Sequence, residues 1–242
     1  MIYLTGDTHC IQIKRLNSKN FPQGNNLAKD DIVIVAGDFG MIFSRPGSFG
    51  YEEQQYWLKW ISDKPWTTVF VDGNHCNHEM LNELEIIEKF GGKMGKVNDS
   101  VFHARRGEIY EIDGQKILTI GGAYSVDKSS RTQGVDWWPG ELLSAKDIDN
   151  AMENLKKHDY EVDYVITHTC CIDIILEYLF SNDYAIFDFD KSTENFLQYV
   201  SNNTTFKLWY FGHMHDDVTM GKYRMLYEDI VILGDTDNII TD

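Results

Sequence analysis

The stretch LWYFGHMHDD, residues 208–217, joins an apolar run to two histidines that are separated by one residue in an acidic loop. A short apolar run rich in aromatic residues is typical of a buried strand, and the glycine that follows is typical of a turn. His213 and His215 are therefore expected just past the end of a strand. The two imidazoles are either an accident of the surface or part of a metal site, and the rest of the sequence decides between these alternatives.

The same pattern, an apolar run followed at once by a polar cluster, occurs four more times in the chain. The other examples are IYLT before GDTH (2–9), DIVIVA before GDFG (31–40), TTVFVD before GNH (67–75) and DYVI before THT (163–169). Amphipathic periodicity predicts helices between several of them, over residues 51–63, 77–90, 144–158 and 192–200. Strands that alternate with helices indicate an α/β fold with largely parallel sheets and right-handed crossovers. Because ligands bind beyond the carboxyl ends of such strands, we expect the five clusters to converge on one place.

A predicted β-hairpin interrupts this alternation. EIYEI (108–112) and QKILTI (115–120) flank Asp113 and Gly114, a pair that tolerates the positive φ values of a type I′ turn. An antiparallel hairpin beside parallel strands makes two packed sheets the expected arrangement. No stretch of proline, serine or charge has the composition of a linker, so we expect one domain over residues 1–242.

Acidic residues dominate the charge of the chain. Asp plus Glu number 38 and Lys plus Arg number 22, which gives a net charge of −16. This field repels polyanions, so long nucleic acid is not an expected partner. No apolar run approaches a membrane span, and the four cysteines form neither a CxxC pair nor a dense disulfide framework. A cytoplasmic location with reduced thiols is therefore expected, whereas the sequence does not determine the oligomeric state.

Eight polar side chains follow the predicted strands, and their chemistry is that of metal ligands. They are Asp7, His9, Asp38, Asn74, His75, His168, His213 and His215. Four to six of these groups would saturate one ion, so two ions that share a ligand explain the set better, with Asp38 as the natural bridging carboxylate. Mixed oxygen and imidazole donors favour Mn²⁺, Fe, Zn²⁺, Co²⁺ or Ni²⁺ over Ca²⁺ and Mg²⁺. His78, His103 and His158 are expected to be ordinary core or surface residues.

The ordered motifs D-x-H, G-D, G-N-H, H and G-H-x-H, from Asp7 to His215, resemble those of the calcineurin-like metallophosphoesterase superfamily. The resemblance implies a four-layer α/β/β/α sandwich with a dinuclear metal centre. It assigns the ligands as two sets that share Asp38: Asp7, His9, Asp38 and His215 for one ion, and Asp38, Asn74, His168 and His213 for the other. Each histidine of the GHMH stretch would thus serve a different metal.

The resemblance also implies a reaction, the hydrolysis of a phosphomonoester or phosphodiester by a metal-bridging hydroxide, with His75 as the catalytic histidine. Two ions lower the pKa of the shared water and clamp the phosphoryl oxygens, while His75 stabilises the developing charge or protonates the leaving oxygen. The expected partner is a small phosphorylated substrate. Alternative functions are a nucleotide pyrophosphatase or cyclic-nucleotide phosphodiesterase, processing of short nucleic-acid ends, and a non-catalytic metal-binding scaffold of the same fold.

The sequence departs from the usual family pattern at two cysteines. Cys10 stands where many relatives have glycine, and Cys76 stands where they often have the acidic residue that orients the catalytic histidine. Together with Cys170 they lie within two residues of predicted site residues, either as redox-sensitive thiols in the cleft or as small residues that fill tight turns. Asp38 is followed by FGMIF, without the D-R pair of the serine/threonine protein phosphatases, and that subclass is not expected.

The segment 121–141, GGAYSVDKSSRTQGVDWWPGE, has glycines, two cations and two adjacent tryptophans but no clear periodicity. One interpretation is a loop over the site, in which Lys128 and Arg131 bind substrate phosphate and an indole stacks on a ring. The other is a surface loop whose Trp137 and Trp138 cover the core. Arg105 and Arg106 are expected to be solvated, as charge pairs next to hairpins usually are.

Overall fold

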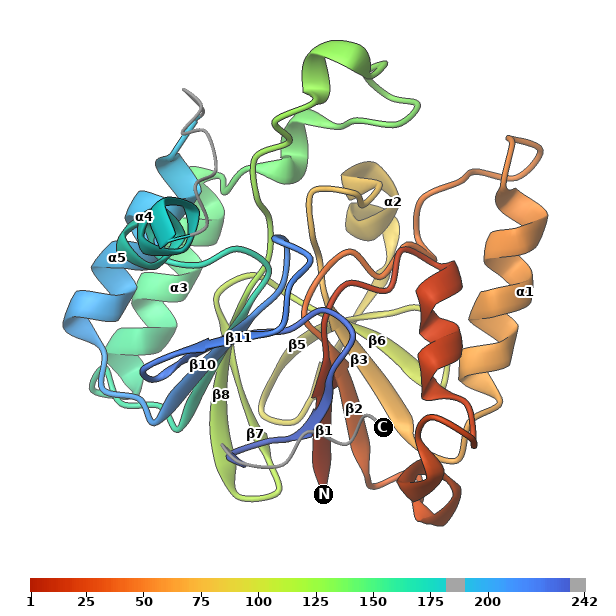
Figure 1. Cartoon of the computed structure of the whole chain (residues 1–242), viewed down its shortest axis with the longest axis horizontal. Helices are drawn as coiled ribbons and strands as arrows, with labels where there is room; N and C mark the ends of the chain where they lie inside the picture. The colour runs from red at the N-terminus through yellow and green to blue at the C-terminus, as the bar shows by residue number, and fades with distance from the viewer. Residues whose placement is uncertain (182–189, 236–242) are drawn as a thin grey trace.

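Two β-sheets packed face to face form the centre of the computed structural model, which describes residues 1–181 and 190–235 (Figure 1). The first sheet has the order β13-β1-β2-β3-β6-β5-β4, and the second has the order β11-β12-β10-β9-β8-β7. The strands of the first sheet are β1 (Ile2–Thr5), β2 (Ile32–Val35), β3 (Thr67–Val71), β4 (Glu85–Lys89), β5 (Gly92–Lys96), β6 (Val101–Ala104) and β13 (Ile230–Ile232). Those of the second are β7 (Glu108–Ile112), β8 (Gln115–Ile120), β9 (Tyr164–Thr167), β10 (Leu208–Phe211), β11 (Val218–Met220) and β12 (Tyr223–Met225).

Helices cover the outer face of each sheet. On the first sheet these are the 3₁₀ helices η1 (Ile11–Leu16) and η2 (Pro22–Asn26) together with α1 (Tyr51–Ser62) and α2 (His78–Glu83). On the second sheet they are α3 (Ala145–Lys157), α4 (Ile172–Ser181) and α5 (Ser192–Asn203). Two further 3₁₀ turns, η3 (Lys128–Ser130) and η4 (Pro139–Glu141), lie in the long connection between β8 and α3. The expected four-layer α/β/β/α sandwich is confirmed.

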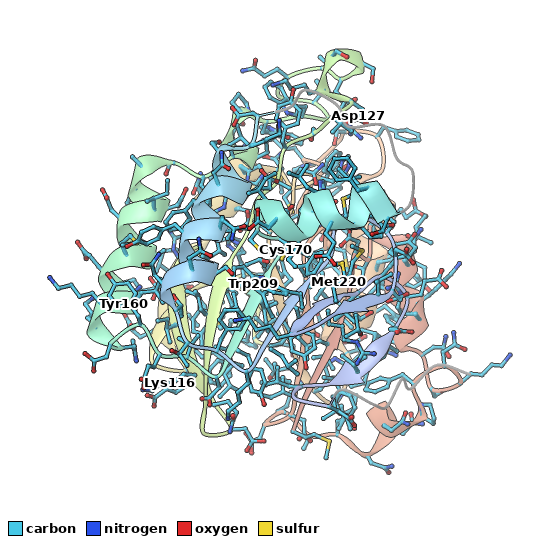
Figure 2. The ribbon with its side chains drawn as sticks, turned by 60° about the vertical axis from the view of Figure 1, so that its left-hand side comes forward. Lys116, Asp127, Tyr160, Cys170, Trp209 and Met220 are labelled. Carbon is cyan, nitrogen blue, oxygen red and sulfur yellow. The ribbon has the colours of Figure 1, made fainter. Side chains whose placement is uncertain are left out.

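The alternation of side chains along the central strands explains the three hydrophobic layers. Ile32 and Ile34 point into the layer between the sheets, whereas Val33 and Val35 point into the layer beneath η1 and α1. Strands covered on both faces must be apolar at every position, so DIVIVA reads as one continuous apolar run. Full burial of each such side chain contributes about 1.5–3 kcal/mol relative to an exposed one. A third layer, which includes Trp209, packs the second sheet against α3, α4 and α5 (Figure 2).

Parallel pairing brings the carboxyl ends of the central strands to one edge. β1, β2, β3 and β6 are parallel in the first sheet, and β8, β9, β10 and β12 are parallel in the second. All five polar clusters therefore follow strands that end at this edge, below the protruding segment 121–141 (Figure 1). Among the helices that the structure describes, none is long and apolar enough to cross a bilayer.

Most of the predicted elements are confirmed with small shifts of their ends. The helices predicted over 51–63, 144–158 and 192–200 correspond to α1, α3 and α5. The hairpin forms with Ile112 opposite Gln115, and its turn residues Asp113 and Gly114 have φ values of 54° and 74°. Positive φ at both positions agrees with the predicted type I′ turn.

The helix predicted over 77–90 is wrong beyond its first half. α2 ends at Glu83, and residues 85–89 form the edge strand β4, which pairs antiparallel with β5. Phe90 and Gly91 make the connecting turn with φ values of 56° and 79°. The pairing with β5 and the contact of Ile87 with the core between the sheets override the local helical periodicity.

Candidate metal centre

Unusual backbone conformations mark the edge where the central strands end. Nine non-glycine residues of the described chain have positive φ, and five of them lie in the predicted site loops: His9, Cys10, Asp38, His213 and His215. Each such conformation costs of the order of 1–3 kcal/mol and persists only where the surrounding structure imposes it. This concentration of strain at one place indicates a functional site.

Two buried carboxylates, Asp7 and Asp38, form the middle of this site. The backbone N–H of His213 donates to both oxygens of Asp7 at 3.1 and 3.2 Å, and the N–H of His75 donates to Oδ1 of Asp38 at 2.8 Å. A Cβ atom on Gly212 would lie 2.2 Å from Asp7 Oδ1, and one on Gly73 would lie 2.1 Å from Asp38 Oδ1. The glycines of the GHMH and GNH motifs are thus required because the carboxylates approach the backbone closely.

Histidine side chains lie around the two carboxylates. Nε2 of His9 and Nε2 of His215 are 2.8 Å apart, and Nε2 of His215 lies 3.1 Å from Asp7 Oδ2. His168 reaches both carboxylates, with Nδ1 at 3.8 Å from Asp7 Oδ1 and Nε2 at 3.6 Å from Asp38 Oδ2. The ring of His213 packs edge to face on that of His168, with centroids 4.9 Å apart. The structure therefore brings all five predicted histidine and aspartate motifs together.

Two groups of donor atoms in the described chain have the spacing to hold a cation. One consists of Asp7, His9 and His215, and the other of Asp7, Asp38 and His168, with the atoms of each group within 4.8 Å of one another. Asp7 is common to both groups, whereas Asp38 Oδ2 lies 3.9 Å from His9 Nε2 and so also approaches the first. The assignment of Asp38 as the bridging ligand stays a prediction.

The electrostatics of the site suit cation binding. Burial would raise the pKa of Asp7, but the charge of His168 and the hydrogen bond from His215 hold it below its ordinary value. Burial lowers the pKa of His213 to about 3 and also lowers that of His9. An ionised carboxylate and the neutral rings of His213 and His9 are the protonation states that metal ligands need. The hydrogen bond with Asp7 instead raises the pKa of His215, so this ring must release its proton when a metal binds. The residues thus fit the divalent ions that the motifs predict.

Asn74 and His75 point to different neighbours although they are adjacent in the chain. Asn74 Oδ1 lies 2.9 Å from His168 Nε2, and its Nδ2 donates to Ser125 Oγ, which donates to Glu141. His75 Nε2 instead lies 3.4 Å from Arg131 Nη2, and burial lowers the pKa of its ring. Asn74 is therefore turned toward the ligand set, whereas the ring of His75 lies at its border.

Arg131 is held at this border by an acidic partner that the sequence did not identify. Asp127 accepts two hydrogen bonds from the guanidinium, from Nε at 2.8 Å and from Nη2 at 2.7 Å. Asp127 belongs to the outer part of the segment 121–141, which stands away from the sheets (Figure 2). Lys128 lies elsewhere, with its Nζ 4.3 Å from the ring centroid of Tyr124. Of the two predicted substrate residues, the structure therefore brings Arg131 next to His75 and leaves Lys128 on an aromatic ring.

The two tryptophans of the segment 121–141 differ in their burial. Trp138 is buried and packs edge to face on Phe43, with centroids 5.1 Å apart, and Trp137 is half-buried. The contact with Phe43 ties the segment to the loop after Asp38. The second interpretation, tryptophans that cover the core, therefore holds for Trp138.

The four cysteines are free, as expected, and burial raises the pKa of Cys170, as it does for the two cysteines next to His9 and His75. The hydrogen bond from Cys170 lowers the pKa of Cys171 to about 7. Burial raises the pKa of Cys10 to about 12 and that of Cys76 well above its ordinary value. Cys76 Sγ accepts a hydrogen bond from the Gly73 N–H at 3.4 Å, and within the described residues Cys76 makes no hydrogen bond with the His75 ring. These positions agree with small residues that fill tight turns.

Sequence reasoning missed several buried polar residues around the centre. Ser125 and Glu141 support Asn74, and Arg15 donates to the backbone carbonyl of Asp7 at 3.0 Å. Arg106 was expected to be solvated, which is wrong: its side chain is buried and pairs with Asp72 at 2.6 Å. The only sign of this pair in the sequence was the isolated Asp72 at the end of TTVFVD. Spacing does not relate Asp72 to Arg106, because the two residues lie 34 positions apart.

Comparison with known proteins identifies the family. The model of the calcineurin-like phosphoesterase family matches residues 1–217. No curated protein matches the chain. Among solved structures, a Thermus thermophilus sulfate thiohydrolase, SoxB, in complex with glycerol is similar with a TM-score of 0.35 and 16% identity. The match covers 82% of this chain and 33% of that one, so the chain spans about a third of its length. The match to the family model covers the whole span from Asp7 to His215, and the chain therefore belongs to the calcineurin-like phosphoesterase family.

Proposed function

We propose that this chain hydrolyses a phosphomonoester or phosphodiester of a small molecule in a centre that holds two divalent transition-metal ions. The observation that carries the proposal is the buried pair Asp7 and Asp38, which has no lysine or arginine ion-pair partner among the described residues. Buried carboxylates without a counter-charge are costly, and histidines surround these two. Family members typically bind two divalent metals, which supports cations as the missing charge.

The proposed ligands are those that the motifs predict. Asp7, His9, Asp38 and His215 would hold one ion, and Asp38, Asn74, His168 and His213 the other. Carboxylate, amide and imidazole donors in one set suit Mn²⁺, Fe, Zn²⁺, Co²⁺ or Ni²⁺. When bound, the two ions would polarise the phosphoryl oxygens and lower the pKa of the attacking water.

The chain itself would supply the groups at the mouth of the centre. His75 would donate a hydrogen bond or a proton to the leaving oxygen, because its ring borders the ligand set without being part of it. Arg131 would bind a non-bridging oxygen of the phosphoryl group, and its bidentate contact with Asp127 fixes the guanidinium in advance. Fixed donors that meet developing charge lower the barrier without reorganisation during the reaction.

The proposed partner is a small phosphorylated substrate, and the proposed location is the cytoplasm. The net charge of −16 disfavours long polyanions, and the four free cysteines suit a reducing compartment. Short anionic esters can still enter, because bound cations would offset the acidic field locally.

Metal analysis combined with a substrate panel tests the proposal. The chain is loaded in turn with Mn²⁺, Fe²⁺, Zn²⁺, Co²⁺ and Ni²⁺, and metal content is measured by elemental analysis. Turnover is then measured on p-nitrophenyl phosphate, bis(p-nitrophenyl) phosphate, a nucleoside triphosphate and a cyclic nucleotide. We expect two ions per chain and turnover of at least one ester class.

The panel also separates the alternatives. Preference for the triphosphate or the cyclic nucleotide over both aryl esters would favour a nucleotide-directed enzyme. Two bound ions without turnover of any ester would contradict the proposal and favour a metal-binding scaffold. A chain that binds no divalent ion would contradict both.

A further inference from the structure

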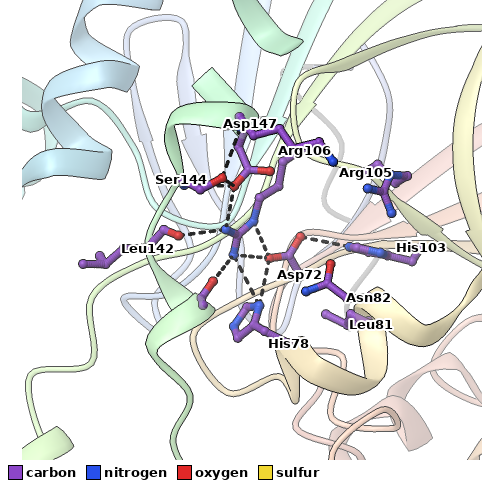
Figure 3. Close-up of a pocket in the computed structure, with 12 residues that line it drawn as sticks. Asp72, His78, Leu81, Asn82, His103, Arg105, Arg106, Leu142, Ser144 and Asp147 are labelled. Atoms are coloured by element: carbon purple, nitrogen blue, oxygen red, sulfur yellow. Dashed lines mark hydrogen bonds and ion pairs between the residues drawn. The ribbon is translucent and has the colours of Figure 1, made fainter. Parts of the chain in front are cut away.

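A second cavity, separate from the metal centre, lies where β6, α2 and the start of α3 meet (Figure 3). Its volume is about 420 Å³, within the range of small-molecule sites in proteins. Twelve residues line it, and none of the eight predicted site residues is among them. The cavity is therefore not a part of the proposed active site.

One wall of the cavity is an ion cluster in which Arg106 and His103 both contact Asp72. The guanidinium of Arg106 donates to Asp72 Oδ2 at 2.6 and 2.9 Å, and His103 Nε2 lies 2.9 Å from Asp72 Oδ1. Burial would raise the pKa of Asp72, but the charge of Arg106 holds it below its ordinary range. Arg106 also donates to the carbonyls of Gly140 and Leu142. The donors of Arg106 are committed within the protein, so this cation is not free for a ligand.

Two other cationic side chains line the cavity without a hydrogen bond or ion pair to the described residues. The side chains of Arg105 and Lys146 make no hydrogen bond or ion pair with any residue in the ranges 1–181 and 190–235, and both also line an adjoining cavity of about 470 Å³. Arg105 follows β6, where its backbone N–H donates to the Tyr110 hydroxyl, and Lys146 lies in the first turn of α3. On a chain with a net charge of −16, two unpaired cations from separate elements converge on one cavity.

The lining also contains polar atoms that lack partners. Nε2 of His78 and Nδ1 of His103 are buried and have no hydrogen bond in the described structure. Burial and the charge of Arg106 lower the pKa of His78 to about 3, so its ring is neutral. Native proteins leave few buried polar atoms unsatisfied, and a bound water or ion is one of the partners that satisfy such atoms. Leu81 and Leu142 add an apolar surface to the same cavity.

We propose that this cavity is a second ligand site, for a small organic anion. Arg105 and Lys146 bind its phosphate or carboxylate group, and Leu81 and Leu142 contact its apolar part. Charge-assisted hydrogen bonds from arginine and lysine are the strong contacts for such groups, and apolar walls with a few placed polar groups are typical of small-ligand sites. The site does not depend on the proposed phosphoesterase activity, because it shares no residue with the metal centre.

Nuclear magnetic resonance of the zinc-loaded full chain tests this site, because Zn²⁺ is diamagnetic and histidine rings lie in both places. Ring resonances of His78, His103, His9 and His75 are followed during titration with inorganic phosphate and, separately, with succinate at constant ionic strength. We expect at least one probe to shift the His78 and His103 resonances in a saturable manner. The tighter probe identifies the anionic group, and binding at the metal centre shifts His9 and His75 instead.

Two variants make the test specific. Arg105→Ala/Lys146→Ala should weaken the binding seen at His78 and His103 at least about tenfold and leave the shifts of His9 and His75 unchanged. Lys156→Ala removes an exposed cation from the same helix outside the cavity and should behave as wild type. Thermal unfolding checks that all variants fold. Equal affinity in the double variant, an equal loss in Lys156→Ala, or no shift of His78 and His103 with either probe would overturn the proposal.

Discussion

The backbone N–H of His213 donates to both carboxylate oxygens of Asp7, at 3.1 and 3.2 Å, across 206 residues of sequence. Asp7 follows β1 of the first sheet, and His213 follows β10 of the second. This contact joins the two sheets at their carboxyl ends and orients the carboxylate toward His215 and His168. The candidate centre therefore exists only when the two halves of the sandwich are packed together, which couples the fold to the site.

Gly212→Ala should disrupt this contact. The added Cβ would lie 2.2 Å from Asp7 Oδ1 and 2.8 Å from the carbonyl oxygen of Ala36, so the loop must shift. We expect a loss of about 1–3 kcal/mol in the free energy of unfolding, together with reduced metal content and activity. Chemical denaturation and elemental analysis measure the two effects. Gly47→Ala is the control: Gly47 also has a positive φ, +83°, but a Cβ atom added there would have no other atom within 4 Å. This variant should retain its metals.

Replacement of the two buried carboxylates identifies the bridging ligand. The motifs predict that Asp38→Ala lowers occupancy at both metal positions and abolishes turnover, whereas Asp7→Ala removes one ion. In the structure Asp7 is common to both groups of donor atoms, so the opposite result would reassign the bridge to Asp7. Elemental analysis of the two variants decides it. Asp38→Ala with two tightly bound ions and normal turnover would contradict the dinuclear assignment.

The parts of the fold that the sequence predicts are those in which local pattern and tertiary environment agree. Val33 and Val35 read as a buried strand because both faces of that strand are covered. The sequence pattern does not predict the strand over residues 85–89, because Leu81, Leu84 and Ile87 repeat with helical spacing. The strand forms because residues 85–89 pair with Gly92–Lys96. Local periodicity cannot report a partner strand, so that element was assigned wrongly.

The same distinction applies to the site. The predicted ligands could be identified from the sequence because each follows an apolar run. The order of their motifs along the chain also indicates that they belong to one site. Arg106 was not visible, because its burial depends on Asp72 and on the carbonyls of Gly140 and Leu142, all more than thirty residues away. Asp127 was also missed, since its role follows from the position of Arg131 beside His75. Supporting residues of this kind are defined by contacts that spacing does not encode.

His75→Ala should separate chemistry from metal binding. Asn74 faces His168, whereas the His75 ring faces Arg131, so removal of the imidazole should leave both ions in place. If His75 protonates the leaving oxygen, kcat should fall about 10²–10⁴-fold on an alkyl phosphate and much less on a p-nitrophenyl ester, whose leaving group needs no proton. Metal content and kcat on both esters are the measurements. Loss of one ion would make His75 a ligand, and equal losses of kcat would indicate stabilisation of phosphoryl charge.

Glu194→Gln should change how stability depends on pH. Glu194 is buried in the first turn of α5, where burial and the nearby charge of Asp190 raise its pKa to about 7, and its Oε2 has no hydrogen bond among the described residues. Between the ordinary carboxyl pKa and pH 7 the folded chain keeps a proton that the unfolded chain releases, so the free energy of unfolding falls as pH rises through this window. At pH 8 the variant, which cannot ionise, should therefore be about 1–3 kcal/mol more stable than wild type, and this advantage should disappear near pH 5. Chemical denaturation at both pH values measures the difference, and a comparison of variants at one pH cancels the contribution of the metal ligands.

Glu53→Gln is the matched control, because Glu53 is exposed at the same position in the first turn of α1 and should show no such pH-dependent gain. Parallel stability curves for wild type and Glu194→Gln from pH 5 to pH 8 would show that the buried carboxyl does not titrate in this range.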